Sequence, residues 1–469
     1  MSHILLLLFA TACTTEEEVW SSPGGGTLSD SDDETTDSGE ADAWELDLDE
    51  NCSPFVMGDD CLTPWPSVFH TAEDASSPTG RRLSYSPDSF VSPDGELPID
   101  PAMFNFADGV SPVSPLFVNL GRDVDPEQLW GPSETQRSLD EDGPIVLVDV
   151  ATGARVPILT EMDMNQRGIG YEGRHALIIR PLAPLDYDTR YAVGISSALR
   201  DTDGAPFTSP DAFVALRDDI LTTDARVEGA RDRYEGVFAA LEADGLAQAE
   251  LLVAWEIPVA SEGQVMGPIR SMQAQAEALN TVEVPYVIDS VETDPTEHAW
   301  KIVRGTFQPP CFLTEDYELV LGADGEVVLQ DGRERPSYPF TVFLPAEAAD
   351  PEASLPLVVV GHGLFGTGES WIDGGTGRSH VQPGLASAGA VGIATDWIGL
   401  SSGDLGLIIE EVVPDIARIQ LVTDRLAQSL VNNLTLIELA HRELVRDPAL
   451  GWTGDGGHLD RERTWYYGG

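Results

Sequence analysis

Short apolar runs separated by turn-forming residues characterise the first folded part of the chain. Residues 145–150, 176–180 and 190–195 combine aliphatic side chains with polar neighbours, which is typical of strands. Their spacing predicts a small β-sandwich of immunoglobulin-like type within residues 51–215. The beginning of this region is rich in proline and serine, so we expect irregular structure there.

The spacing of apolar residues becomes helical beyond this region. From about residue 209 to 280, apolar residues recur at i, i+3, i+4 and i+7, which predicts helices. We interpret residues 216–281 as a helical spacer. Strands return after residue 282, and we predict three of them, over residues 301–307, 326–329 and 340–344.

Strands and helices alternate from Leu355 onward. We predict strands at residues 355–360, 390–396 and 463–467 and helices at residues 382–387 and 414–443. This alternation is typical of a parallel sheet with helices on its faces. The predicted fold class is therefore multidomain: an all-β sandwich, a helical spacer, and an α/β domain over residues 282–469.

The charge balance is strongly acidic. There are 80 Asp and Glu residues against 26 Lys and Arg residues, for a formal net charge of −54. Because phosphate binding needs clustered basic residues, this balance excludes nucleic acid as a partner. The acid excess fits an adaptation for solubility or high salt, and it equally fits a compositional bias of the source genome.

The N-terminus carries a short apolar segment, residues 4–12, which ends in small residues and is followed by Cys13. It is far below the ~20 residues that a transmembrane helix needs. It resembles a bacterial lipoprotein signal, which implies that residues 1–13 direct export and that Cys13 is lipidated. The alternative is an ordinary secretory signal with a chance cysteine, and both interpretations export the protein.

The next segment, residues 14–50, is rich in Asp, Glu, Ser, Thr and Gly and has no basic residue. It repels itself and cannot build a core, so we predict an acidic disordered linker. Such a linker would hold a folded domain away from a membrane. We therefore expect a bacterial cell-envelope protein, an outer-membrane or surface lipoprotein that contacts the membrane through its lipid anchor only.

The chain has four cysteines, and the oxidising compartment reached by export determines their chemistry. Cys52 and Cys61 are close in sequence, so we predict a disulfide between them; two free thiols are the alternative. Cys311 is the odd cysteine, and we expect it to be buried.

Glycine-rich segments end two predicted strands of the α/β domain. One strand breaks into GHGLFG at residues 361–366, and the last strand runs into YYGG at residues 466–469. The first segment resembles the His-Gly-Leu oxyanion turn of bacterial true lipases. The second resembles the approach to a Gly-x-Ser-x-Gly nucleophile elbow. With RGTF at residues 304–307 and the Ig-like region, the chain is similar to large exported bacterial lipase-like lipoproteins of the α/β-hydrolase superfamily.

This resemblance implies the first half of a serine hydrolase that ends before its nucleophile. The Leu364 N–H would be one oxyanion-hole donor, His362 and Gly363 would shape the turn, and Gly468 and Gly469 would begin the elbow. The implied activity is hydrolysis of carboxylic esters or lipids through an acyl-enzyme, without a cofactor, and inactive as this fragment. An amide, peptide or polyester bond remains open as the substrate bond.

Other residues invite different roles. His362 precedes any such serine, whereas hydrolase triads run Ser, Asp or Glu, then His, so we do not expect it to be the base. For the same reason we interpret Asp396 as a structural or mouth residue; His380 either faces the opening or is solvated. No Cys or His cluster has metal-ligand spacing, and there is no phosphate-binding loop. The alternative function is a non-catalytic cell-surface lipoprotein that binds a partner through its Ig-like domain.

Overall fold

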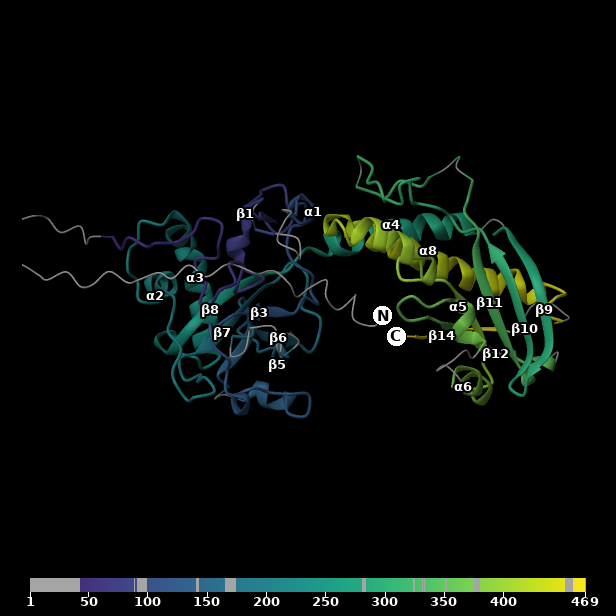
Figure 1. Ribbon diagram of the computed structural model, residues 1–469, viewed down its shortest axis with the longest axis horizontal. Helices are drawn as coiled ribbons and strands as arrows, with labels where there is room; N and C mark the ends of the chain where they lie inside the picture. The colour runs from purple at the N-terminus through teal and green to yellow at the C-terminus, as the bar shows by residue number, and fades with distance from the viewer. Residues whose placement is uncertain are drawn as a thin grey trace, which may run out of the picture. The chain divides into compact units, whose positions relative to one another are not determined.

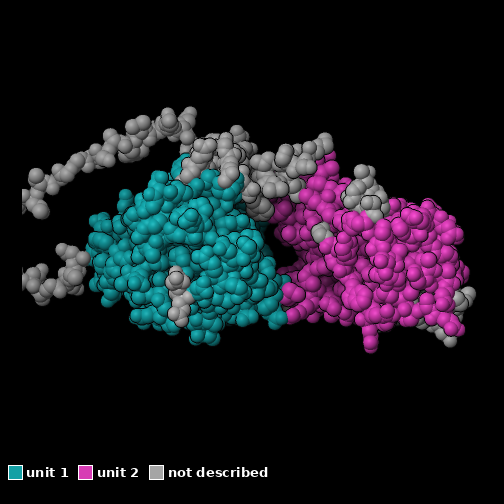
Figure 2. Space-filling view, turned by 90° about the horizontal axis from the view of Figure 1, so that it is seen from below, with its two compact units in different colours: residues 1–265 teal, residues 266–469 magenta. Residues whose placement is uncertain are grey.

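The computed structural model describes residues 43–468, except 88, 91–98, 141–142, 165–173, 281–283, 324, 331, 333, 351, 374–379 and 452–458. The chain forms two compact units, residues 1–265 and 266–469, coloured separately in Figure 2. Cys13 and Gly469, for which we predicted lipidation and the start of the elbow, lie outside the described residues.

Unit 1 contains two three-stranded antiparallel sheets. The first has the order β3 (Leu116–Val118), β6 (Leu177–Pro181), β5 (Ile158–Met162). The second has the order β4 (Ile145–Asp149), β7 (Arg190–Ser196), β8 (Leu251–Pro258). Both sheets contribute to one hydrophobic core, so the region is β-rich; its Ig-like topology stays a prediction.

Helices complete this core. The helices of unit 1 are α1 (Ala102–Asn105), α2 (Asp211–Arg217) and α3 (Ala225–Ala243), and a small hairpin pairs β1 (Thr71–Glu73) with β2 (Arg81–Leu83). The carboxylate of Asp224 caps α3 by accepting the N–H of Arg226 at 2.8 Å. α3 then packs on β4, β7 and β8.

Strand β8 falls within residues 216–281, for which we predicted only helices. All eight of its residues are buried. A strand covered on both faces shows no polar alternation, so its apolar run cannot be distinguished from a buried helix by period. The structure therefore integrates this part of the expected spacer into the β-rich core of unit 1.

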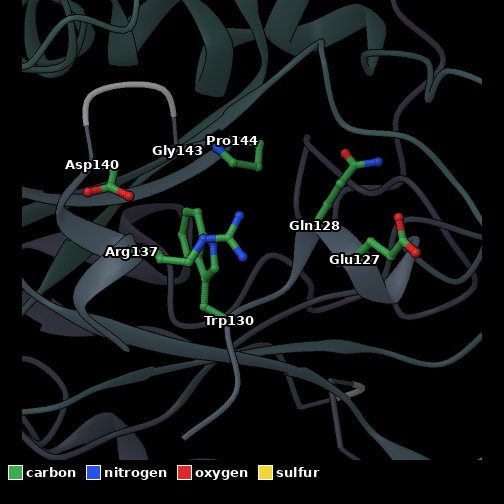
Figure 3. A pocket seen from close by; sticks show the side chains of 7 residues that line it. All are labelled: Glu127, Gln128, Trp130, Arg137, Asp140, Gly143 and Pro144. Atoms are coloured by element: carbon green, nitrogen blue, oxygen red, sulfur yellow. The ribbon is translucent and has the colours of Figure 1, made fainter. Parts of the chain in front are cut away.

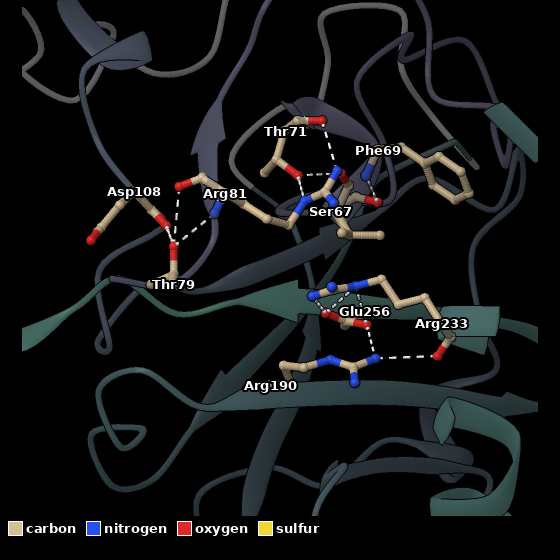
Figure 4. A network of polar contacts seen from close by, with 10 residues as sticks. Ser67, Phe69, Thr71, Thr79, Arg81, Asp108, Arg190, Arg233 and Glu256 are labelled. Carbon is tan, nitrogen blue, oxygen red and sulfur yellow. Dashed lines mark hydrogen bonds and ion pairs between the residues drawn. The ribbon is translucent and has the colours of Figure 1, made fainter. Parts of the chain in front are cut away.

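A buried ion-pair network ties β8 to its neighbours (Figure 4). Glu256 is fully buried on β8 and accepts hydrogen bonds from Arg190 Nη2 at 2.6 Å and Arg233 Nε at 2.8 Å. The two arginines belong to β7 and α3. A buried carboxylate is tolerated only when it is paired in this way, so the network fixes strand and helix together.

Helix α4 (Glu262–Asn280) follows β8, and unit 2 is built on a six-stranded mixed sheet (Figure 1). In spatial order its strands are β14 (Leu459–Tyr467), β12 (Leu355–Val360), β13 (Val391–Thr395), β11 (Tyr338–Pro345), β10 (Ala299–Phe307) and β9 (Tyr286–Thr296). β12 is parallel to both β13 and β14, and the remaining pairs are antiparallel.

Helices cover both faces of this sheet. The helices are α5 (Gly368–Ile372), α6 (Val381–Ser387), the single turn α7 (Leu405–Leu407) and α8 (Gln420–Arg442). Val359 and Ile393 pack with Leu436 of α8, whereas the adjacent Val360 and Ala394 pack with Leu385 of α6. The period of two along the strands thus separates an α8 face from an α5–α6 face.

Short helical turns occupy several connections. The 3-10 turns are Val68–His70, Pro126–Gln128, Thr135–Leu139, Gln248–Glu250, Ala346–Ala349, Ser402–Asp404, Ile416–Ile419 and Leu444–Arg446, and a π turn spans Ile408–Val412. The last predicted helix begins at Gln420 rather than Pro414, because extended Asp415 caps a separate 3-10 turn.

One predicted strand is absent from the described sheets. Residues 326–329 form only an isolated bridge between Val327 and Leu321. Val327 packs with Met272 of α4 and Phe312 instead of joining a sheet. The apolar residues at 326–329 are therefore explained by burial against a helix and not by strand pairing.

Candidate active site at the carboxyl ends of β12, β13 and β14

The strand order brings the two predicted glycine-rich segments together. β12 lies between β14 and β13, with Val360 opposite Tyr467, and the Gly361 N–H donates to the Tyr467 carbonyl at 2.9 Å. The chain leaves β12 to form β13 on one side and then returns to form β14 on the other. In open α/β sheets, ligands bind at such a switch point, beyond the carboxyl ends of the strands.

His362 braces the turn that follows β12. It is buried; its Nε2 accepts the Trp397 N–H at 2.7 Å, and its Nδ1 lies 2.9 Å from the Gly363 carbonyl oxygen. Because Nε2 accepts, the proton is on Nδ1, which donates to that carbonyl. Both ring nitrogens are engaged, so His362 holds the exits of β12 and β13 together and is not placed to act as a base.

A type II β-turn presents Leu364. The Gly366 N–H donates to the Gly363 carbonyl at 2.9 Å, and Phe365 between them has a φ of 55°. The Phe365 N–H donates to Leu400, and the Ser402 N–H donates to Gly366 at 2.9 Å. The turn is therefore fixed on both sides to the segment that follows β13.

The Leu364 N–H has no acceptor among the described residues, and 46% of the residue is exposed. A solvent-accessible N–H that no protein acceptor occupies bonds water, which a ligand can displace, so this one is an available donor. The residue that we predicted as an oxyanion donor thus lies at the switch point with its N–H free. Gly363 shapes the turn through its carbonyl, and Gly468 follows β14 next to Gly361.

Asp396 stabilises the start of α5. Its Oδ1 accepts the Gly368 N–H at 2.8 Å, at the N-terminus of that short helix. Burial raises the pKa of the Asp396 carboxyl above its ordinary value, although this hydrogen bond opposes the shift. These contacts fit the structural role that we expected for Asp396.

Aromatic side chains that the sequence reasoning did not select gather at the same strand ends. The Tyr466 ring lies edge-on to the Trp397 ring, with centroids 6.0 Å apart. The Tyr467 hydroxyl lies 3.1 Å from His380 Nε2, so His380 belongs to this cluster. The sequence signal that could have identified this cluster is the pair of tyrosines directly before two glycines at the end of a predicted strand.

The structure also describes three of the four cysteines. Cys52 and Cys61 form a disulfide with Cα atoms 4.6 Å apart, and Cys311 is buried as a reduced thiol.

Within the described residues there is no group of three or more His, Cys, Asp or Glu that could hold a metal ion. None of the helices described is long and apolar enough to span a bilayer.

Two pockets lie away from these strand ends. One of about 120 Å³ in unit 1, shown in Figure 3, is lined by Glu127, Gln128, Trp130, Arg137, Asp140, Gly143 and Pro144. A wider one of about 390 Å³ in unit 2 is lined by Gln275, Gly322, Ala323, Glu326, Val327, Val328 and Leu329. Neither lining contains a serine, cysteine or histidine.

Comparisons with known proteins give weak likenesses to esterases. No protein-family model and no curated sequence matches the chain. A structure assigned as an acetyl xylan esterase of Bacteroides fragilis is similar at a TM-score of 0.25 and 11% identity, over 43% of this chain and 46% of that one. The cell-wall-degrading esterase LipA of Xanthomonas oryzae is similar at a TM-score of 0.15 and 17% identity, over 32% of this chain and 38% of LipA. The chain thus spans less than half of either protein.

Proposed function

We propose that this chain is part of an exported serine hydrolase that cleaves carboxylic esters through an acyl-enzyme. One observation carries the proposal: the free Leu364 N–H and the end of β14 lie at the same switch point of the sheet. Acyl transfer needs an oxyanion donor after one strand and a nucleophile after its neighbour. The finer fold assignment, an α/β-hydrolase domain in residues 282–469, rests on this strand order together with helices on both faces.

In this proposal the nucleophile is a serine that directly follows Gly469. Its hydroxyl oxygen attacks the ester carbonyl carbon, and the Leu364 N–H donates to the oxygen on which negative charge develops. Such a donor accelerates the reaction because it binds the transition state more tightly than the ester. His362 and the type II turn contribute indirectly, since they hold this N–H in place before substrate arrives.

Export and lipidation at Cys13 belong to the same proposal. The Cys52–Cys61 disulfide supports an oxidising compartment, because such bonds are rare in reducing cytosol. Labelling with a radioactive fatty acid should mark the wild-type protein and not the Cys13→Ala variant. An equal label on both proteins would contradict lipidation at this position.

The central experiment measures p-nitrophenyl ester hydrolysis by the full-length protein and by a variant with alanine in place of the residue after Gly469. We expect the wild type to hydrolyse the ester and the variant to lose at least a thousandfold in kcat. An unchanged rate would refute the serine mechanism. If the residue after Gly469 is not a nucleophile, a non-catalytic surface protein becomes the better explanation.

A further inference from the structure

The hydroxyl of Tyr466 lies close to the first residues beyond β12 and β14. Tyr466 is on β14, opposite Val359 of β12, and its side chain leans toward the end of the sheet. A Cβ added to Gly361 would overlap the hydroxyl oxygen, and a Cβ added to Gly468 would be 2.6 Å from it. These glycines are the first residues beyond the two strands, so their lack of side chains makes room for this hydroxyl.

The Tyr466 ring is oriented by one aromatic contact, and its hydroxyl has no hydrogen-bond partner among the described residues. The edge-on contact with Trp397 restricts the ring, whereas 56% of the residue is exposed. Partial burial raises the pKa of Tyr466 above its usual value. The phenol therefore keeps its proton at neutral pH and is able to donate a hydrogen bond.

The neighbouring tyrosine provides an internal contrast. Tyr467 is also about half exposed, but its hydroxyl is engaged with His380 Nε2 at 3.1 Å. Two phenols thus lie in succession at the end of one strand, one occupied and one free. A free phenol and an unpaired backbone N–H at the same end of a sheet are the kinds of donor that stabilise charge developing on an oxygen.

We propose that Tyr466 is a catalytic residue whose hydroxyl donates a hydrogen bond to the carbonyl oxygen of an ester bound at these strand ends. The role rests on the proposed function, because it requires the ester to be attacked at this switch point. Tyr466 shares the developing negative charge with the Leu364 N–H. It keeps its proton throughout, so no proton transfer to or from the phenol is part of the step.

The test compares Tyr466→Phe with Tyr467→Phe in the full-length protein, using p-nitrophenyl ester hydrolysis. We expect Tyr466→Phe to lower kcat ten- to a hundredfold with KM changed less than about threefold, because the lost bond strengthens only in the transition state. Tyr467→Phe removes a hydroxyl from the same strand and should stay within about twofold of wild type.

A second measurement separates catalysis from structure. A trifluoromethyl ketone adds to the serine as a charged tetrahedral adduct, and Tyr466→Phe should weaken its binding about tenfold, while Tyr467→Phe should not. Equal kinetics and equal inhibitor binding in both variants would overturn the role of Tyr466 and leave the serine mechanism standing. A wild-type protein without serine-dependent hydrolysis would overturn both.

Discussion

Strands β8 and β14 are both edge strands, but they differ in how far their side chains are buried. Every residue of β8 is buried, including Trp255, whereas in β14 only Leu459 is buried. Trp465 and Tyr466 of β14 are each 56% exposed. Exposed aromatic residues on an edge strand favour aggregation, so their presence needs a functional reason or a covering partner.

The two strands also differ in whether their polar groups have hydrogen-bond partners. On β8 the Glu256 carboxylate is bound by two arginines. The Tyr466 hydroxyl at the end of β14 and the Leu364 N–H in the turn after β12 have no partner among the described residues. A buried polar group must be paired, as Glu256 is, whereas an exposed donor without a protein partner can bind a ligand. β8 therefore serves as scaffold, and the end of β14 is where we propose the site.

The largest effect should come from removing the buried tryptophan. Trp255→Ala leaves a large cavity in the core of unit 1 and should lower the free energy of unfolding by about 3–5 kcal/mol. Trp465→Ala, on the exposed strand, should change it by less than about 1 kcal/mol. Urea unfolding followed by circular dichroism measures both. Similar losses in the two variants would show that β14 is as structural as β8.

The next effect tests the free backbone donor. Leu364→Pro removes only the N–H, because proline is favoured at the second position of a type II turn. In the full-length protein we expect kcat to fall by about 10²–10³, or roughly 3–4 kcal/mol. Leu364→Ala keeps the N–H and should stay near the wild-type rate. An active proline variant would place the oxyanion donor elsewhere.

A smaller effect should follow from filling the space that Tyr466 occupies. In Gly361→Ala the new Cβ displaces the phenol, whose exposed ring can swing outward with little loss of stability. The expected result is a tenfold or greater loss of kcat, as in Tyr466→Phe. The double variant should lose no more than either single variant, because both remove the same hydrogen bond. Additive losses in kcat would separate the glycine from the tyrosine.

Much of the fold follows from local sequence patterns. The strands at residues 355–360 and 390–396 were predictable because they are short apolar runs, and the helix before the last strand because its apolar residues recur with helical spacing. β8 was not, since burial on both faces removed the polar positions that distinguish a strand from a helix. At Val327, sequence alone could not distinguish a residue that pairs in a sheet from one that is buried against a helix.

The site could be predicted only as far as backbone chemistry determines it. The GHGLFG turn identified Leu364, because glycines indicate where the chain must bend after a strand. Tyr466 was missed, since its importance depends on Gly361 lying opposite it on another strand, about a hundred residues earlier. No local pattern contains that pairing; it becomes visible only with the strand order.

The smallest effect concerns the helix that covers β8. Hydrogen bonds from Arg231, followed by those from Thr222, lower the pKa of Glu228 to about 2. Since an unfolded glutamate titrates near ~4.3, this carboxylate stabilises the fold fully above that pH, and the contribution disappears as the pH falls toward about 2. Glu228→Gln should therefore lower the free energy of unfolding by about 1–2 kcal/mol at pH 7, with a difference that shrinks below pH ~4.5. The exposed Glu235 on the same helix supplies the matched control, and Glu235→Gln should remain within ~0.5 kcal/mol at either pH. Urea midpoints measured between pH 7 and pH 3 decide the matter: a difference for Glu228→Gln that is independent of pH would mean that the contribution of Glu228 comes from packing and not from its charge.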